Sequence, residues 1–296
     1  MNNDLKPKLA LIFSMLVFGT IGIFRRLLPF GSGTIAFSRG LIGALFLFVL
    51  LLLKKQRLDR KALKANALIL CVSGALIGFN WILLFEAYNY TTVATATLCY
   101  YMAPIIVVIF SPLVLKEKLT LKKSICAVCA LCGMVLVSGI LQQGFGDSGA
   151  MRGVLCGLGA AALYASVMML NQKLHDIGAY DKTIVQLFMA AVVILPYTLL
   201  TESVRREDIS PKTVIVLLVV AVVHTGFAYA LYFGSMDRLS AQTVALFSYI
   251  DPIVAVILSA LLLKEHMGVP EIIGAVLVLG STIIGEIEFK KRKTNE

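Results

Sequence analysis

Four ionisable side chains interrupt long apolar runs of this 296-residue sequence, and they are the residues best placed to do chemistry. They are Arg39, Glu86, His224 and Asp251. A charged group costs about 2.5–3.5 kcal/mol at the centre of a membrane-spanning helix on insertion scales. Each of these residues therefore needs a partner or a function.

Asp251 stands beside Pro252 near the middle of an apolar run. One interpretation is a carboxylate that pairs with a cationic group of a substrate or that carries a proton. The alternative is a structural hydrogen bond to a neighbouring helix. Pro252 favours a site, because a proline inside a helix frees a carbonyl about one turn earlier and adds polar groups at the same depth.

The other three ionisable residues each allow two interpretations. An unperturbed imidazole titrates near neutral pH, so His224 could pass a proton to Asp251, or it could bond between helices as a neutral ring. Arg39 could bind a substrate carboxylate or pair with Glu86, or its long side chain could extend to the membrane interface. Glu86 lies near the end of an apolar run, where it could simply be solvated.

Aromatic residues accompany these groups in two matching sets. Each set contains a pair one helical turn apart and a tyrosine three residues before a proline, and the six residues are Trp81, Phe85, Tyr101, Tyr229, Phe233 and Tyr249. If their faces line a cavity, the site is an aromatic box with one acid, suited to an aromatic or amine-bearing solute. The alternative is ordinary packing between helices.

The matching sets belong to a repeat of the chain. Pro104 and Pro252 each stand 13 residues before the glutamate of a Leu-Lys-Glu sequence, and the two copies are 148 positions apart. Both prolines are expected to break a helix. We expect two repeats, residues 1–148 and 149–296, which differ where Asp251 replaces Ala103.

Composition indicates a membrane protein. The chain is 59% hydrophobic and 15% charged, and its mean hydropathy is +0.89. Such a chain has too little polar surface for a soluble fold. Apolar runs of about 20 residues predict an all-α integral membrane protein with ten transmembrane helices. The expected spans are 8–28, 33–53, 66–88, 92–114, 121–141, 152–172, 183–201, 212–236, 241–263 and 269–289.

The odd number of spans in each repeat predicts that the second repeat is inverted relative to the first. Lysine and arginine counts in alternate loops agree, because nineteen of the 27 basic residues fall on one side and seven on the other. The positive-inside rule then places both termini in the cytoplasm of a multi-pass protein of the cell membrane. The net charge of +10 reflects these loops and does not indicate nucleic-acid binding.

Several other chemistries find no support in the sequence. Cys126, Cys129 and Cys132 share one apolar run at three-residue spacing, but no second set of ligands completes a zinc site. No phosphate-binding glycine-rich motif indicates ATP hydrolysis. We therefore expect neither a metal nor a cofactor.

These features together resemble the EamA branch of the drug/metabolite transporter superfamily. The resemblance rests on the doubled five-span unit, the aromatic-x-x-Pro of each half, the Leu-Lys-Glu sequences, Phe18-Gly19 and Arg39. It implies a bundle of two inverted five-helix halves whose third and fourth spans, helped by the first, line a central cavity. It also implies secondary active transport, usually export. Phe18 departs from the family pattern, in which many members have tryptophan before the glycine.

We therefore expect an alternating-access transporter that exports a small metabolite or drug-like solute with an aromatic or amine group. Proton antiport through Asp251, with His224 as a second coupling residue, is the hypothesis for energy coupling. An amino-acid carrier and an uncoupled exchanger are the alternatives within transport, and a channel or an intramembrane enzyme are the alternatives outside it. The expected partners are a small-molecule substrate and the lipid bilayer, with a monomer or homodimer as the assembly.

Overall fold

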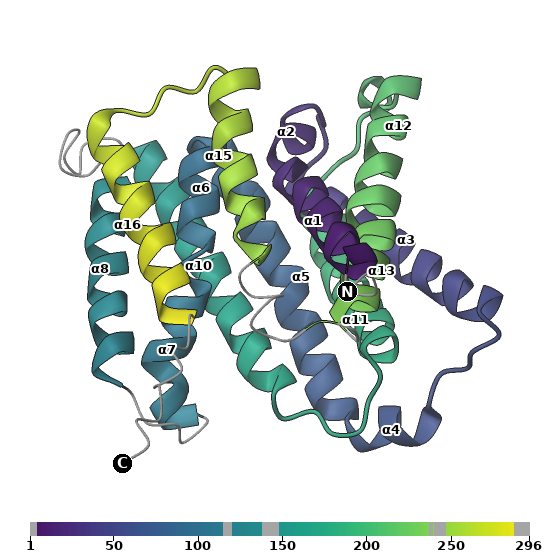
Figure 1. The fold of residues 1–296 in the computed structure, drawn as a ribbon. Helices are drawn as coiled ribbons and strands as arrows, with labels where there is room; N and C mark the ends of the chain where they lie inside the picture. The colour runs from purple at the N-terminus through teal and green to yellow at the C-terminus, as the bar shows by residue number, and fades with distance from the viewer. Residues whose placement is uncertain (1–4, 115–119, 138–147, 237–238, 240–246, 287–296) are drawn as a thin grey trace, which may run out of the picture.

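The computed structural model describes residues 5–114, 120–137, 148–236, 239 and 247–286, and this part of the chain is a bundle of helices (Figure 1). These ranges contain helices and turns but no strand. The all-α expectation is confirmed for them.

The first half of the chain contributes helices that mostly run back and forth along the bundle. Their bounds are α1 Leu5–Gly19, α2 Ile21–Arg26, α3 Ser32–Leu53, α4 Arg60–Ala65, α5 Ala67–Tyr90, α6 Val93–Tyr100, α7 Ala103–Val114 and α8 Leu121–Val137.

The second half of the chain contributes the remaining helices, one of which is a π-helix. Its bounds are α10 Ser148–Asn171, α11 Ala179–Thr201, the short 3-10 helix η2 Arg206–Asp208, α12 Pro211–Leu218, the π-helix η3 Val219–Phe227, α13 Ala228–Met236, α15 Ile250–Leu262 and α16 Val269–Glu286.

Seven helical segments of the described chain are long and apolar enough to cross a membrane, and three shorter apolar helices accompany them. The seven are Leu5–Arg26, Ser32–Leu53, Ala67–Tyr90, Val93–Phe110, Gly149–Asn171, Ala179–Thr201 and Pro211–Ser235. The three shorter ones are Ser124–Val137, Ile250–Leu262 and Val269–Ser281. Each of the ten expected spans overlaps one of these segments, and the seven long ones make the chain multi-pass.

Among the described residues, the first and the fourth of the expected spans are not continuous helices. The first span breaks at Thr20, between α1 and α2. The fourth span breaks after Tyr100, and α7 begins at Ala103 with Pro104 in its first turn. A proline is tolerated there, because the first turn has no intrahelical partner for its missing N–H. Pro252 likewise lies in the first turn of its helix, α15.

The eighth span contains a π-helix that no sequence pattern predicted. Within it, the Thr225 hydroxyl donates to the Val220 carbonyl at 3.3 Å, five residues back. The wider turn of a π-helix changes which residues face a neighbour, and such segments are frequent at functional sites. Here it presents His224 and Thr225 to the helices α2 and α3.

The Leu-Lys-Glu sequence that closes α15 forms a turn that brings its glutamate back to the bundle. Lys264 has a φ of 55°, a left-handed conformation that ends the helix. Glu265 then accepts from the Val93 amide at 2.8 Å and pairs with Arg26 at 3.1 Å. The carboxylate thus caps the start of α6 and ties it to α2. The first copy, Leu115-Lys116-Glu117, lies outside the described residues.

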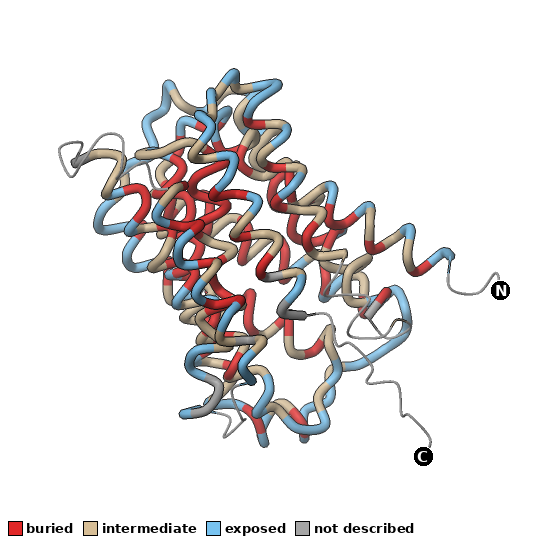
Figure 2. Tube along the Cα trace, turned by 60° about the vertical axis from the view of Figure 1, so that its left-hand side comes forward, coloured by how far each residue is buried: buried red, intermediate tan, exposed pale blue. Residues whose placement is uncertain are grey.

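The helix contacts connect the two halves of the chain throughout. The most extensive pairings are α5 with α10, α8 with α16, α3 with α11, and α5 with α11. Buried residues gather along the inner faces of the helices, and exposed residues lie on the outer faces and at the ends (Figure 2). Exposed leucines and isoleucines on the outer faces are what a lipid-facing surface requires.

Candidate functional site

Asp251 lies in the first turn of α15, where it faces the first half of the chain. The Tyr101 hydroxyl donates to Asp251 Oδ2 at 2.7 Å. The Tyr101 and Tyr249 rings lie 6.5 Å apart between their centroids. The two aromatic-x-x-Pro sequences, which lie far apart in the chain, therefore meet at this carboxylate.

Gly19 explains how α1 approaches Asp251 so closely. A Cβ atom at Gly19 would lie 2.7 Å from the Asp251 carbonyl oxygen and 2.7 Å from the Val254 Cβ. Only glycine allows this contact between the two backbones. The Phe18-Gly19 sequence thus serves the packing of the first span against the helix that carries the acid.

Five tyrosines interact electrostatically with the Asp251 carboxylate, and we call them the tyrosine cluster. They come from α5, from α6 and its end, from α10 and from α13, and all lie within electrostatic range of Asp251: Tyr88, Tyr100, Tyr101, Tyr164 and Tyr229. Tyr100 and Tyr164 stack with centroids 5.3 Å apart. Tyr164 nevertheless keeps 38% of its surface accessible.

Arg39 interacts electrostatically with three members of the tyrosine cluster, Tyr88, Tyr100 and Tyr229. Its side chain is only 6% exposed, so it does not extend to the membrane interface. The guanidinium carbon lies 4.3 Å from the centre of the Trp81 ring and 5.4 Å from that of Phe85, and Nε donates to the Thr225 hydroxyl at 2.9 Å. These are cation–π contacts, which hold the charge in a fixed place.

The terminal nitrogens of Arg39 have no protein partner among the described residues. No carboxylate of these residues forms an ion pair with Arg39, and Glu86 lies instead within electrostatic range of Arg25. Neither nitrogen is both fully buried and without a partner. Since they have no hydrogen-bond partner among the described residues, both keep some accessible surface. A buried cation without a protein anion is well suited to an anion supplied from outside.

Arg39 and Asp251 share neighbours without touching each other. The hydroxyls of Tyr88, Tyr100 and Tyr229 lie within electrostatic range of both. The arrangement is a cation and an anion that share a group of aromatic hydroxyls as neighbours. Such a region can bind a solute that carries both charges.

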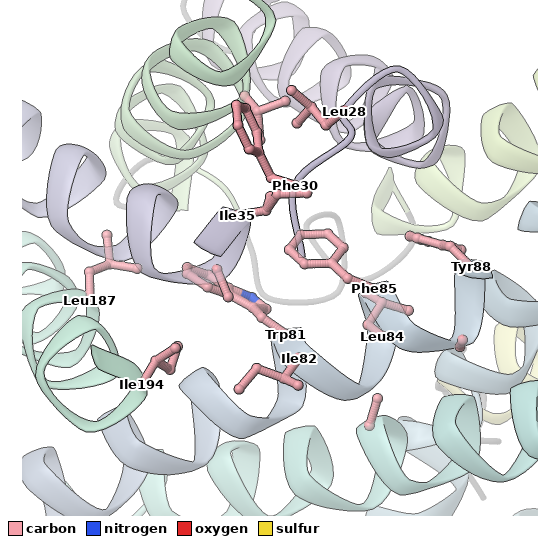
Figure 3. Packing of buried hydrophobic residues seen from close by; sticks show 14 of the residues in the cluster. Leu28, Phe30, Ile35, Trp81, Ile82, Leu84, Phe85, Tyr88, Leu187 and Ile194 are labelled. Atoms are coloured by element: carbon pink, nitrogen blue, oxygen red, sulfur yellow. The ribbon is translucent and has the colours of Figure 1, made fainter. Parts of the chain in front are cut away.

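The aromatic pairs expected to form a box occupy different environments. Trp81 and Phe85 are 5% and 0% exposed and lie in the core beneath Arg39 (Figure 3). In this conformation they support the guanidinium, and Phe85 offers no surface to a solute. Tyr229 and Phe233 instead join edge-to-face contacts with Phe18 and Tyr232.

His224 makes its contacts away from Asp251. Its Nε2 lies 2.8 Å from the Thr20 hydroxyl, at the break in the first span, and its Nδ1 lies 3.3 Å from the Val219 carbonyl. The Phe24 ring packs on the imidazole with centroids 4.6 Å apart. No hydrogen bond joins His224 to Asp251 in this part of the chain, so the geometry favours the interhelical interpretation over direct proton transfer.

Sequence reasoning missed four residues that complete this region: Thr20, Tyr100, Tyr164 and Thr225. The sequence shows that Tyr100 stands next to Tyr101 and that Thr225 stands next to His224. It does not show their partners, because these lie on distant helices. No group of three or more metal-ligating side chains occurs within the described ranges.

Comparison with known proteins decides the family. The model of the EamA-like transporter family matches residues 5–139 and again residues 151–284. The chain belongs to the EamA-like transporter family. The family model matches it twice, and the second match includes His224 and Asp251.

Curated relatives and a solved structure agree with this membership. The chain is 26% identical to the uncharacterized transporter YxxF of Bacillus subtilis, over 91% of this chain and 86% of that protein. It is 27% identical to a protein of Salmonella typhimurium named probable amino-acid metabolite efflux pump, over 61% of this chain and 63% of that protein. A crystal structure with 16% identity superposes with a TM-score of 0.68 over 94% of this chain and 95% of that one, which supports the fold.

Proposed function

We propose that this EamA-family protein is a secondary active transporter that exports a small amphoteric solute with an aromatic or other apolar body, such as an amino acid or a related metabolite. The observation that carries the proposal is that Arg39 and Asp251 have the same tyrosines as neighbours but no ion pair with each other. Arg39 is free to bind a carboxylate, and Asp251 is suited to an ammonium group. The name of the Salmonella relative points in the same direction.

Alternating access is the mechanism we propose, with two inverted five-helix halves. The double match of the family model supports two repeats. The helix pairs support a two-fold relation between the halves, because α3 contacts its counterpart α11, α8 contacts its counterpart α16, and the pairing of α5 with α10 has its equivalent in α1 with α13.

Chain direction supports the inversion. In Figure 1, α5 runs upward from its start beside α4. Its counterpart in the second half, the span from α12 to α13, runs downward. The chain likewise descends from α6 to α7 and rises along α15. Corresponding spans that run in opposite directions are what an inverted repeat requires. On this view the ten-span count holds, and the three shorter helices complete it.

We propose that the protein lies in the cell membrane with the lower end of Figure 1 facing the cytoplasm. The basic connection between α3 and α4 lies at that end, and basic loops are usually cytoplasmic. Proton antiport at Asp251 remains our hypothesis for coupling. A proton and an ammonium group would then compete for one carboxylate, which is enough to make their movements mutually exclusive.

Three labelled solutes test the proposed binding mode in proteoliposomes. Phenylalanine carries both charges, 2-phenylethylamine carries only the amine, and 3-phenylpropionate carries only the carboxylate. We expect Asp251→Asn to reduce transport of the two amines, and Arg39→Gln to reduce transport of phenylalanine while sparing 2-phenylethylamine. Each loss should be about tenfold or more, as expected for a charge-assisted contact.

The same measurement can contradict the proposal. If the wild-type protein moves none of the three solutes against or down a gradient, the amphoteric substrate class is wrong. If Arg39→Gln reduces all three equally, Arg39 maintains the structure and does not read the carboxylate.

A further inference from the structure

Tyr101 joins the two halves of the chain at their equivalent points. It follows α6 and precedes Pro104, so it lies at the break of the fourth span. Asp251 follows Tyr249 at the start of α15, beside the equivalent proline. The hydrogen bond of 2.7 Å from the Tyr101 hydroxyl to Asp251 Oδ2 therefore crosses from one repeat to the other.

The strength of this bond depends on what Asp251 carries. A carboxylate is a strong acceptor for a phenol hydroxyl, because the charge assists the bond. A proton on the carboxyl group removes that charge, and a bound ammonium group competes for the same oxygens. The link between the halves is thus strong when Asp251 is unoccupied and weak when it is occupied.

We propose that Tyr101 is a positioning residue that senses the occupancy of Asp251 and resists reorientation of the two halves while the carboxylate is empty. This inference rests on the proposed role of Asp251 as the loading site. Alternating access moves the broken fourth span of one half against α15 of the other, so a bond between them opposes that movement. An empty carrier that does not reorient prevents leakage of the driving ion.

The surroundings of Asp251 allow this role. The ionisable groups that face it are the tyrosine cluster from α5, α6, α10 and α13, with no second acid or base within the described ranges. α1 packs against its backbone at Gly19 and brings no titratable side chain to it. Glu265, which pairs with Arg26, lies beyond the opposite end of α15.

Hydrogen–deuterium exchange of the purified full-length protein tests the proposal without any solute, because protons alone can load Asp251. Peptides from the first turns of α15 and from α6 are followed at acidic and alkaline pH, with rates corrected for intrinsic exchange. In the wild-type protein we expect the corrected exchange rate to be about fivefold lower at alkaline pH. This is the change in rate expected when one hydrogen bond stabilises the closed state.

Two variants should lose this pH dependence and stay at the same fast level. Tyr101→Phe cannot form the link, so its corrected exchange should stay at the fast, acidic level at both pH values. Asp251→Asn carries an uncharged side chain at every pH, as the protonated carboxyl group does, so its bond from Tyr101 lacks charge assistance and its exchange should also stay at the fast level. Tyr100→Phe, which removes a neighbouring hydroxyl without a bond to Asp251, should keep the pH dependence.

The proposal is overturned if Tyr101→Phe keeps the wild-type pH dependence, or if the wild-type protein shows none. Should Tyr101→Phe fold poorly, Asp251→Asn decides alone, since exchange at the slow, alkaline level would show that the link does not depend on the charge of Asp251. Glu265 is unchanged in every variant and cannot explain a difference between them. Absence of transport of the three labelled solutes would refute the proposed function and leave this result standing.

Discussion

At the scale of single residues, His224 illustrates how one side chain can be assigned a role by its contacts. A histidine near the middle of a span at the expected depth of Asp251 invites a proton relay. Its two ring nitrogens instead meet Thr20 and the Val219 carbonyl. The geometry supports a bond that holds the break of the first span against the π-helix.

This interpretation predicts a measurable coupling between Thr20 and His224. Thr20→Val, His224→Leu and the double variant should give a coupling free energy of about 0.5–1.5 kcal/mol, as hydrogen bonds between membrane helices do. Unfolding of the four proteins in mixed detergent micelles provides the values. Thr20→Val paired with Thr225→Val is the control and should be additive, because Thr225 bonds Arg39. Additivity in the His224 pair would contradict the bond.

At the scale of helices, the close approach of α1 to α15 depends on one missing side chain. Gly19 ends α1 at the point where its backbone meets the Asp251 carbonyl. The helix that carries the acid is therefore positioned by the first span. Any side chain at residue 19 must displace α15.

We predict that Gly19→Ala destabilises the protein by about 1–3 kcal/mol, the cost of overpacking a close contact. The matched control is Gly280→Ala in α16, where an added Cβ meets nothing within 4 Å. That variant should be neutral or stabilising by up to about 1 kcal/mol, because alanine has the higher helix propensity. Melting temperatures in detergent compare the two, and equal effects would show that the α1–α15 contact is not tight.

The breaks and the π-helix mark the limit of pattern reading at this scale. Apolar runs predicted the spans, because residues that face lipid must be apolar whatever their neighbours. They did not reveal the break at Thr20 or the π-helix at Val219–Phe227, since both depend on contacts with other helices. Proline was a better guide, as Pro104 and Pro252 lie in the first turns of α7 and α15.

At the scale of the whole molecule, inversion of the two halves makes a prediction about sidedness. In a variant without its six natural cysteines, single cysteines at Arg57 and Lys173 should react with a membrane-impermeant thiol reagent only from the cytoplasmic side. A cysteine at Glu207 should react only from the outside. All three positions are exposed. Labelling of residues 57 and 173 from opposite sides would contradict the ten-span topology.

The sequence alone indicated that this chain crosses a membrane as helices, that it contains an internal repeat, and that it resembles the EamA-type transporters. These properties follow from local composition and from short sequence motifs that recur along the chain. It also singled out Asp251 and Arg39, because a charge in an apolar run is conspicuous.

Only the tertiary structure decided which groups meet. Tyr101 and Asp251 are 150 residues apart, Arg39 and Thr225 are 186 apart, and Thr20 and His224 are 204 apart. No periodicity links such positions, since their contact depends on how distant helices cross and rotate. Burial in a membrane is a local property of the sequence, whereas a hydrogen bond between helices belongs to the assembled bundle.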